Sequence, residues 1–335
     1  MRPAAAQFNL EKVHIEYGSR VPGHPAEERE AVIRDLLQPL PTVNSKYFYD
    51  DRGSRLFEEI TALPEYYQTR TEEALLENTA AEIASLTRAR NLVELGSGAG
   101  RKIRLLLDAI QKAGRLDGCV LLDINQTFLL LSTRRLAEEY PGIDIVGWVG
   151  DFVHDLGEFG RSSHRLFVFL AGTIGNLHPA ERTTFLRALR SVLGPGESFL
   201  VGLDLIKDID RLEAAYNDAA GVTAEFNRNI LRVLNRNFGT DFNPDAFEHV
   251  AFYEPRNEWI EMRLRALQSM SVDLGRGRRL RLEAGDEIRT EISCKFTRPS
   301  FQRSLIDTGL RVSRWFTDPA DLFALALVRP ESDHG

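Results

Sequence analysis

Short apolar segments alternate with helical segments between residues 91 and 206, and this alternation constrains the fold more than any other feature of the chain. The apolar segments are residues 92–95, 118–125, 143–152, 165–177 and 198–206. They are apolar at consecutive rather than alternate positions, which is typical of strands buried on both faces. The sequence therefore predicts an α/β fold with a doubly wound, mostly parallel, Rossmann-like sheet.

The pattern changes after this alternating region. Residues 209–250 are polar and helical, and the segments that follow resemble antiparallel strands joined by glycine turns. A helix and two closing strands then complete the first pattern. We therefore expect a domain of residues 71–206 plus 296–331, interrupted by a smaller α+β substrate-binding domain of residues 207–295 together with 20–70.

The overall composition is that of a globular protein of 335 residues, with 43% hydrophobic and 27% charged residues. The formal net charge of −7 argues against nucleic-acid partners, because phosphate binding requires a basic surface. The N-terminal stretch lacks the apolar core of a secretory signal, and no apolar window of about 18 residues follows it. We expect a cytoplasmic protein that does not enter a membrane.

The sequence holds two cysteines and seven histidines. Cys119 and Cys294 are far apart and lie within strand-like segments, so we interpret both as buried small apolar side chains. The histidines do not pair at metal-ligand spacing, and none accompanies a serine or cysteine nucleophile motif. We expect no metal site.

Residues 275–282, GRGRRLRL, are the one strongly basic stretch. The spacing of its glycines favours a hairpin turn with solvated arginines. Contact with an anionic partner is the alternative.

Three glycines at alternate positions, Gly96, Gly98 and Gly100, join the first apolar segment to the helix after it. Such a loop exposes backbone N–H groups and lets a ligand approach the backbone closely. The dinucleotide fingerprint requires a further glycine where this chain has Arg101. The spacing instead suits S-adenosylmethionine, which has no pyrophosphate.

The ends of the next two apolar segments carry groups suited to the same ligand. Asp123 can accept from both ribose hydroxyls, Asp151 can accept from the adenine amino group, and Phe152 can lie beside the adenine ring. Glu94 is a further hydrogen-bonding support for the loop. Lys102 either meets the methionine carboxylate or is a solvated lysine of the first helical turn.

Six segments occur in an order that is far more specific than the glycine loop. They are YFYDDRGSRLFEEITALPEYYQTR, VELGSGAGRKIRLLLDAI, AGTIGNL, RLEAAYNDAAGVTAEFNRN, IEMRLRA and TEISCKF. From about residue 20 to residue 329 the chain resembles the histidine-specific Nα-methyltransferases of ergothioneine biosynthesis. The resemblance implies a class I methyltransferase that transfers three methyl groups from S-adenosylmethionine to the α-amine of free L-histidine, giving hercynine.

The chain departs from the family pattern at two places. Its loop is GSGAGRKIR, which is closer to the generic methyltransferase motif than to the family's usual loop. Gln68 stands where a proline is usual, and we expect it to alter only the stiffness of a loop.

Two residues are predicted to bind the backbone of the amino acid. The amide of Asn176 can donate to a carboxylate and accept from an amine, although the same residue could simply cap the helix that begins at Pro179. Tyr216 is either a carboxylate donor or an ordinary tyrosine of an amphipathic helix. The resemblance implies the substrate role for both, and a direct part in catalysis for Asn176.

Glu291 and Ser293 lie two apart in a strand-like segment, so both face the same side. A carboxylate and a hydroxyl can together accept from and donate to imidazole nitrogens, although a solvated strand face has the same pattern. The resemblance implies that this pair recognises imidazole. It also places Met262, which alternation turns away from its neighbours Glu261 and Arg263, against the substrate ring.

The N-terminal segment supplies the aromatic residues Tyr49, Phe57 and Tyr66. Aromatic rings suit a product with a permanent trimethylammonium group, but they could equally pack this segment onto the inserted region. The resemblance implies that Tyr66 lines the histidine site beside the cofactor and that Tyr49 lies near the reacting amine. Phe57 is the least defined of the three.

Three other functions remain open at this point. The protein could methylate another amino acid or a small amine, or it could be a nucleotide sensor or an NAD-dependent oxidoreductase with the same sheet. The position of Arg101 disfavours NAD. We expect a monomer with a small-molecule substrate.

Overall fold

The computed structural model describes residues 13–18, 25–160 and 163–331. Residues 1–12 of the N-terminal stretch and the predicted domain boundary at residue 20 lie outside these residues. Within them, eight strands form the main sheet in the order β1-β4-β3-β2-β5-β6-β13-β12. They are β1 (Val13–Tyr17), β2 (Asn91–Leu95), β3 (Gly118–Asp123), β4 (Asp144–Val149), β5 (Arg165–Phe169), β6 (Ser198–Asp204), β12 (Leu310–Thr317) and β13 (Phe323–Pro330).

The strands from β1 to β6 run parallel, and β13 enters between β6 and β12 antiparallel to both. This order with one reversed strand is that of a class I methyltransferase sheet, so the predicted fold is confirmed. β5 and β6 are buried at every position because helices cover both faces of the sheet.

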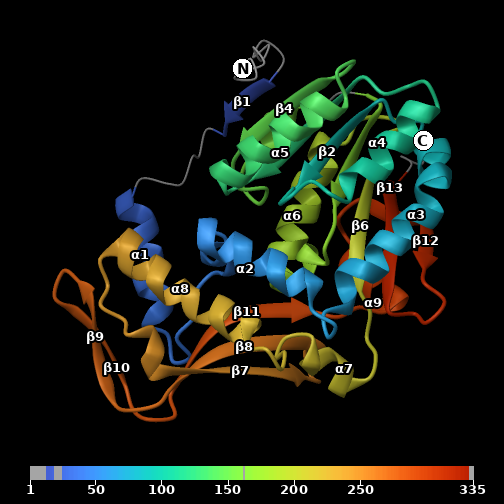
Figure 1. Cartoon of the computed structure of the whole chain (residues 1–335). Coiled ribbons are helices and arrows are strands. Elements are labelled where there is room, and N and C mark those ends of the chain that lie inside the picture. The colour runs from blue at the N-terminus through green and yellow to red at the C-terminus, as the bar shows by residue number, and fades with distance from the viewer. Residues whose placement is uncertain (1–12, 19–24, 161–162, 332–335) are drawn as a thin grey trace, which may run out of the picture.

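Two hydrophobic clusters hold the helices against the sheet (Figure 1). One face packs against α3 (Tyr67–Thr87), α4 (Ile103–Lys112) and α5 (Gln126–Glu139). The other packs against α6 (Pro179–Val192) and α9 (Arg298–Ser304). The parallel strands therefore end together at one open edge.

A separate region packs below that edge in Figure 1. Its elements are α7 (Ile209–Ala214), α8 (Val222–Phe238), β7 (Phe247–Glu254), β8 (Trp259–Ala266), β9 (Met270–Gly275), β10 (Arg278–Leu282) and β11 (Glu287–Cys294). β11, β8 and β7 form an antiparallel sheet whose cluster also includes residues of α1 (Pro25–Leu36) and α2 (Asp51–Ala62). The predicted smaller α+β region is therefore present.

One expectation for this region is wrong. Residues 247–250 were expected to be helical, but they begin β7, where Phe247 pairs with Ala266 of β8. Pairing with a strand distant in sequence outweighs the local helical pattern there.

The inserted region begins and ends at one point of the main sheet. Leu205, just after β6, bridges Phe296, just after β11. The Phe296 N–H donates to the Asp204 carbonyl at 2.8 Å, and the Ile206 N–H donates to the Phe296 carbonyl at 2.9 Å. The two ends of the insertion therefore lie side by side.

The basic stretch forms the β9–β10 hairpin, as its glycine spacing predicts. Arg276 and Arg278 are not simply solvated, because both form ion pairs with Glu30 of α1 at 2.9 and 2.7 Å. Cys119 and Cys294 are buried free cysteines, as expected. Across the described ranges, no helix is long and apolar enough to cross a membrane, and no group of His, Cys, Asp and Glu side chains could hold a metal.

Candidate active site

A cavity of about 800 Å³ lies between the open edge of the main sheet and the inserted region. One wall consists of the loops after β2 to β6, and the other consists of β8, β11 and the N-terminal aromatic segment. The predicted site residues that line it are Tyr49, Tyr66, Gly96, Gly98, Asp123, Asp151, Phe152, Asn176, Tyr216, Met262, Glu291 and Ser293. The fold thus brings both predicted sets, cofactor and substrate, to one cavity.

The glycine loop is fixed from the end of β3. The Gly98 N–H and the Asn125 N–H each donate to the Asp123 carboxylate at 2.9 Å. Burial raises the pKa of Asp123, although these backbone donors oppose the rise. Gly96 (φ +72°) and Gly98 (φ +48°) adopt left-handed conformations that side chains disfavour. The loop therefore presents a carboxylate and an open backbone to the cavity, which fits a ribose.

Asp151 and Phe152 form the adjoining part of this wall. The Asp151 carboxylate accepts from the Val153 N–H at 2.9 Å, and the Asp151 N–H donates to Asp155 at 2.8 Å. The Phe152 ring packs edge to face on Phe169, with the ring centroids 4.8 Å apart. The turn after β4 is thus ordered by its own carboxylates, and an aromatic side chain borders the cavity where an adenine ring is expected.

Lys102 and Glu94 lie behind the glycine loop. Lys102 forms an ion pair with the fully buried Glu72, which also accepts from the Ala171 N–H at 2.8 Å. Lys102 is not among the residues that line the cavity, so this geometry does not support its predicted contact with the methionine carboxylate. Burial raises the pKa of Glu94, and one of its oxygens has no partner among the described residues.

The substrate half of the cavity is held by two side-chain hydrogen bonds. Asn176 Nδ2 donates to Glu291 Oε1 at 2.8 Å. The Tyr216 hydroxyl donates to Ser293 Oγ at 2.8 Å. Met262 stands directly opposite Glu291 in the β8–β11 ladder, so the two side chains share one face. Five of the residues that the resemblance assigns to the substrate therefore lie together in this half of the cavity.

Glu291 has an unusual environment for a carboxyl group. Burial raises its pKa to about 7, although Lys295 and the Asn176 hydrogen bond oppose the rise. The charge of this side chain therefore changes near neutral pH.

Residues 28–330 match the family described as histidine-specific, SAM-dependent methyltransferases. The chain belongs to this family. It is 46% identical to the histidine N-alpha-methyltransferase of Mycobacterium tuberculosis over 91% of this chain and 95% of that protein. It is 47% identical to the Mycolicibacterium smegmatis enzyme of the same name over 89% and 94%.

More distant relatives share part of their length with this methyltransferase. Ergothioneine biosynthesis protein 1 of Neurospora crassa is 31% identical over 84% of this chain and 32% of that protein. Among solved structures, the CcbJ methyltransferase of Streptomyces caelestis is 19% identical, with a TM-score of 0.45 over 78% of this chain and 89% of that one.

The aromatic residues of this methyltransferase border the cavity and also pack the N-terminal segment onto the inserted region. Phe57 contacts Tyr49 and Tyr66 edge to face, with centroids 5.8 and 6.1 Å apart, so the three rings form one cluster. Phe48 stacks on Phe226 of α8 at 4.5 Å, which packs the segment onto the inserted region. Burial raises the pKa values of Tyr49 and Tyr66 well above their usual range, so neither hydroxyl ionises to become a base.

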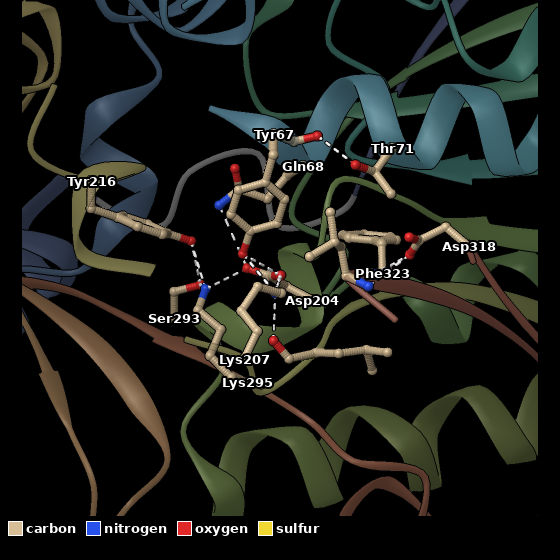
Figure 2. Close-up of polar contacts among 12 residues, drawn as sticks. Tyr67, Gln68, Thr71, Asp204, Lys207, Tyr216, Ser293, Lys295, Asp318 and Phe323 are labelled. Carbon is tan, nitrogen blue, oxygen red and sulfur yellow. Dashed lines mark hydrogen bonds and ion pairs between the residues drawn. The ribbon is translucent and has the colours of Figure 1, made fainter. Parts of the chain in front are cut away.

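A buried polar network behind the substrate half was not predicted (Figure 2). Asp204, at the end of β6, forms ion pairs with Lys295 and Lys207 and accepts from the Tyr67 hydroxyl at 2.7 Å. One signal was available, because Lys295 continues the period of two that contains Glu291 and Ser293. Asp204 had no such signal. Lys207 lies three residues after it, but its other cationic partner, Lys295, is distant in the sequence.

The expectation for Gln68 is wrong. This residue lies in the first turn of α3 rather than in a loop, and it is buried. Its amide points at Asp204 with a long, weak contact of 3.5 Å (Figure 2). The substitution of the usual proline therefore reaches the wall of the substrate site.

Proposed function

We propose that this methyltransferase transfers three methyl groups in turn from S-adenosylmethionine to the α-amine of L-histidine, giving hercynine for ergothioneine biosynthesis. One observation carries the proposal. Polar groups suited to a carboxylate and to an imidazole line the same cavity as the glycine loop and Asp123. The names of the two mycobacterial relatives support histidine as the acceptor.

The cofactor half is assigned to Asp123, Asp151 and Phe152, with Gly96 and Gly98 allowing close approach of the ligand. When bound, S-adenosylmethionine supplies a methyl group activated by its sulfonium. The buried Asp123 carboxylate would accept from the ribose hydroxyls, since its two backbone contacts leave acceptor capacity free.

The amine needs a free lone pair rather than a strong base. An α-amine has a pKa of about 8 in model compounds, so a neutral fraction exists at neutral pH. We assign Asn176 and Tyr216 to the carboxylate and amine of histidine, and Tyr49 and Tyr66 to the wall beside the amine. Their task is alignment, because positioning alone can supply most of the acceleration of such a transfer.

The imidazole is assigned to Glu291, Ser293 and Met262. Glu291 would accept from the ring N–H, Ser293 would hydrogen-bond the other nitrogen, and Met262 would pack on the ring. An analogue without these nitrogens would leave the buried polar groups unpaired, which costs binding energy. This arrangement supports histidine over phenylalanine or tryptophan.

The division into two domains also remains a proposal, with residues 71–206 plus 296–331 binding the cofactor and residues 20–70 plus 207–295 binding histidine. That the protein is a monomer stays a prediction. A cytoplasmic location stays a prediction.

Mass spectrometry of the product made from histidine and S-adenosylmethionine tests the function. We expect mono-, di- and trimethylhistidine to appear in that order, with trimethylhistidine as the end point, because a pocket that holds the carboxylate and the ring leaves the amine free to rotate. Parallel reactions with other amino acids should give little product. Dimethylhistidine as the terminal product, or faster methylation of another amino acid, would contradict the proposal.

A further inference from the structure

The ammonium group of Lys295 contacts three oxygen atoms from three segments of the chain (Figure 2). Its Nζ lies 2.9 Å from Asp204 Oδ2, 2.9 Å from Ser293 Oγ and 2.8 Å from the Tyr216 hydroxyl. An ammonium has three N–H donors and no acceptor, so these contacts use all of them. Lys295 is buried and therefore acts on a substrate only through its neighbours.

These contacts fix the direction of two hydroxyl protons. A hydroxyl that accepts from an ammonium must turn its own proton away from that cation. A phenol is a stronger acid than an aliphatic alcohol, so Tyr216 donates its proton to Ser293, and Ser293 then accepts from both Tyr216 and Lys295. Only the O–H of Ser293 remains available for a further hydrogen bond, and Ser293 lines the cavity. The cavity is therefore offered a donor at this position and not an acceptor.

Lys295 remains charged because of Asp204. Burial disfavours the ammonium, but the Asp204 carboxylate and the Tyr216 hydroxyl outweigh it and raise the pKa of Lys295. Burial likewise disfavours the carboxylate of Asp204, but Lys295 and Lys207 outweigh it and lower that pKa. The ion pair also joins the end of β6 to the residue after β11, so the orientation of the hydroxyls is tied to the main sheet.

We propose that Lys295 is a positioning residue for substrate selection, which makes Ser293 a hydrogen-bond donor to an unprotonated ring nitrogen while Glu291 accepts from the ring N–H. The inference rests on the proposed histidine methylation. Neutral imidazole offers one acceptor and one donor nitrogen, which matches this pair. Indole offers only a donor, so the Ser293 O–H would be left without an acceptor on the ring.

Lys207 provides a matched control. It also pairs with Asp204, but its other contacts are the Tyr67 hydroxyl at 2.7 Å and the Leu205 carbonyl. Lys295→Met and Lys207→Met each remove one of the two cations that neutralise Asp204. Both variants therefore lose one cation beside Asp204. Only Lys295→Met also removes the ammonium group that donates to Tyr216 and Ser293.

The first measurement is kinetic. We expect Lys295→Met to raise KM for histidine by at least about tenfold, the effect of losing a hydrogen bond to a charged group, with the dissociation constant of S-adenosylhomocysteine unchanged. Lys207→Met should leave KM close to the wild-type value. The melting temperatures of both variants show how much of each change is structural.

The second measurement compares activity with two histidine analogues and tests whether Ser293 donates its proton to the ring. Thiazolylalanine has an acceptor nitrogen and no ring N–H, whereas pyrrolylalanine has a ring N–H and no acceptor. The wild type and Lys207→Met should share one ratio of thiazole to pyrrole activity, and Lys295→Met should move that ratio towards the pyrrole because Ser293 becomes free to turn its proton away from the ring. If Lys295→Met does not fold, Ser293→Ala takes its place and should move the ratio in the same direction.

A Lys295→Met protein with the wild-type KM and activity ratio would overturn the inference, as would equal changes in Lys207→Met. A Ser293→Ala protein with the wild-type ratio of thiazole to pyrrole activity would overturn it as well. Failure of the wild type to methylate histidine would instead contradict the proposed function.

Discussion

Asn176 Nδ2 donates to Glu291 Oε1 across 115 residues of sequence at 2.8 Å. The bond joins the loop after β5 of the main sheet to β11 of the inserted region. It therefore couples the residue expected at the reacting amine to the residue expected at the substrate ring.

This coupling is measurable with a double-mutant cycle. Asn176→Ala and Glu291→Ala should each lower kcat/KM for histidine by about 10- to 100-fold, since each removes a hydrogen-bonding group that lines the cavity. Because each change also releases the partner, the double variant should lose less than the product of the two effects. Additive losses would show that the two residues act independently.

The cofactor assignment is tested by Asp123→Ala. Loss of a charged hydrogen-bonding partner should weaken S-adenosylhomocysteine binding by about 10- to 100-fold in isothermal titration. Asp117→Ala, which removes an exposed carboxylate paired with Arg90, is the control and should bind normally. Unchanged affinity in the Asp123 variant would place the ribose elsewhere.

The raised pKa of Glu291 predicts a pH-dependent stability. Folding raises this pKa from 4.5 to about 7, so the stability linked to its proton is complete below pH 4.5 and is lost as the pH rises through 7. Glu291→Gln cannot ionise. Between pH 4.5 and pH 8, the free energy of unfolding of this variant should rise relative to the wild type by about 3 kcal/mol.

Urea denaturation of the wild type and Glu291→Gln at both pH values measures this difference. Glu77→Gln, at an exposed position on α3, is the control and should show no such trend. A constant difference between Glu291→Gln and the wild type would mean that Glu291 titrates normally.

Arg165 and Glu197 form a buried ion pair that should contribute strongly to stability where β5 begins, in the middle of the sheet. The Arg165 guanidinium donates to both Glu197 oxygens, at 2.6 and 2.9 Å, and both side chains are buried. Glu197→Ala leaves an unpaired buried cation and should cost about 3–5 kcal/mol in urea denaturation. Breaking the exposed Arg90–Asp117 pair should cost far less. Similar losses for the two pairs would contradict this ranking.

The sequence predicts those features that depend on local patterns. Consecutive apolar residues identify the parallel strands, and the carboxyl ends of such strands meet at one edge, which brings Gly96, Asp123 and Asp151 together. A period of two places Glu291 and Ser293 on one face. These inferences needed no knowledge of which strands are neighbours.

The features that sequence reasoning missed depend on partners far apart in the chain. Lys102 does not line the cavity, because it forms an ion pair with Glu72 of α3 instead. Residues 247–250 form a strand because β8 pairs with them. Asp204 and Lys295 meet only once the inserted region has folded back. Local propensity contains no information about such encounters.

The two ends of the insertion meet at Leu205 and Phe296, and this has an evolutionary consequence. The chain leaves the main sheet after Leu205 and returns at Phe296, so the roughly ninety residues between them connect two adjacent points, as a tight turn would. The entropy of closing such an excursion grows only slowly with its length, by about 0.6 kcal/mol for each doubling. Lineages can therefore lengthen, shorten or exchange the insertion, to which we assign recognition of the acceptor, while inheriting the main sheet unchanged.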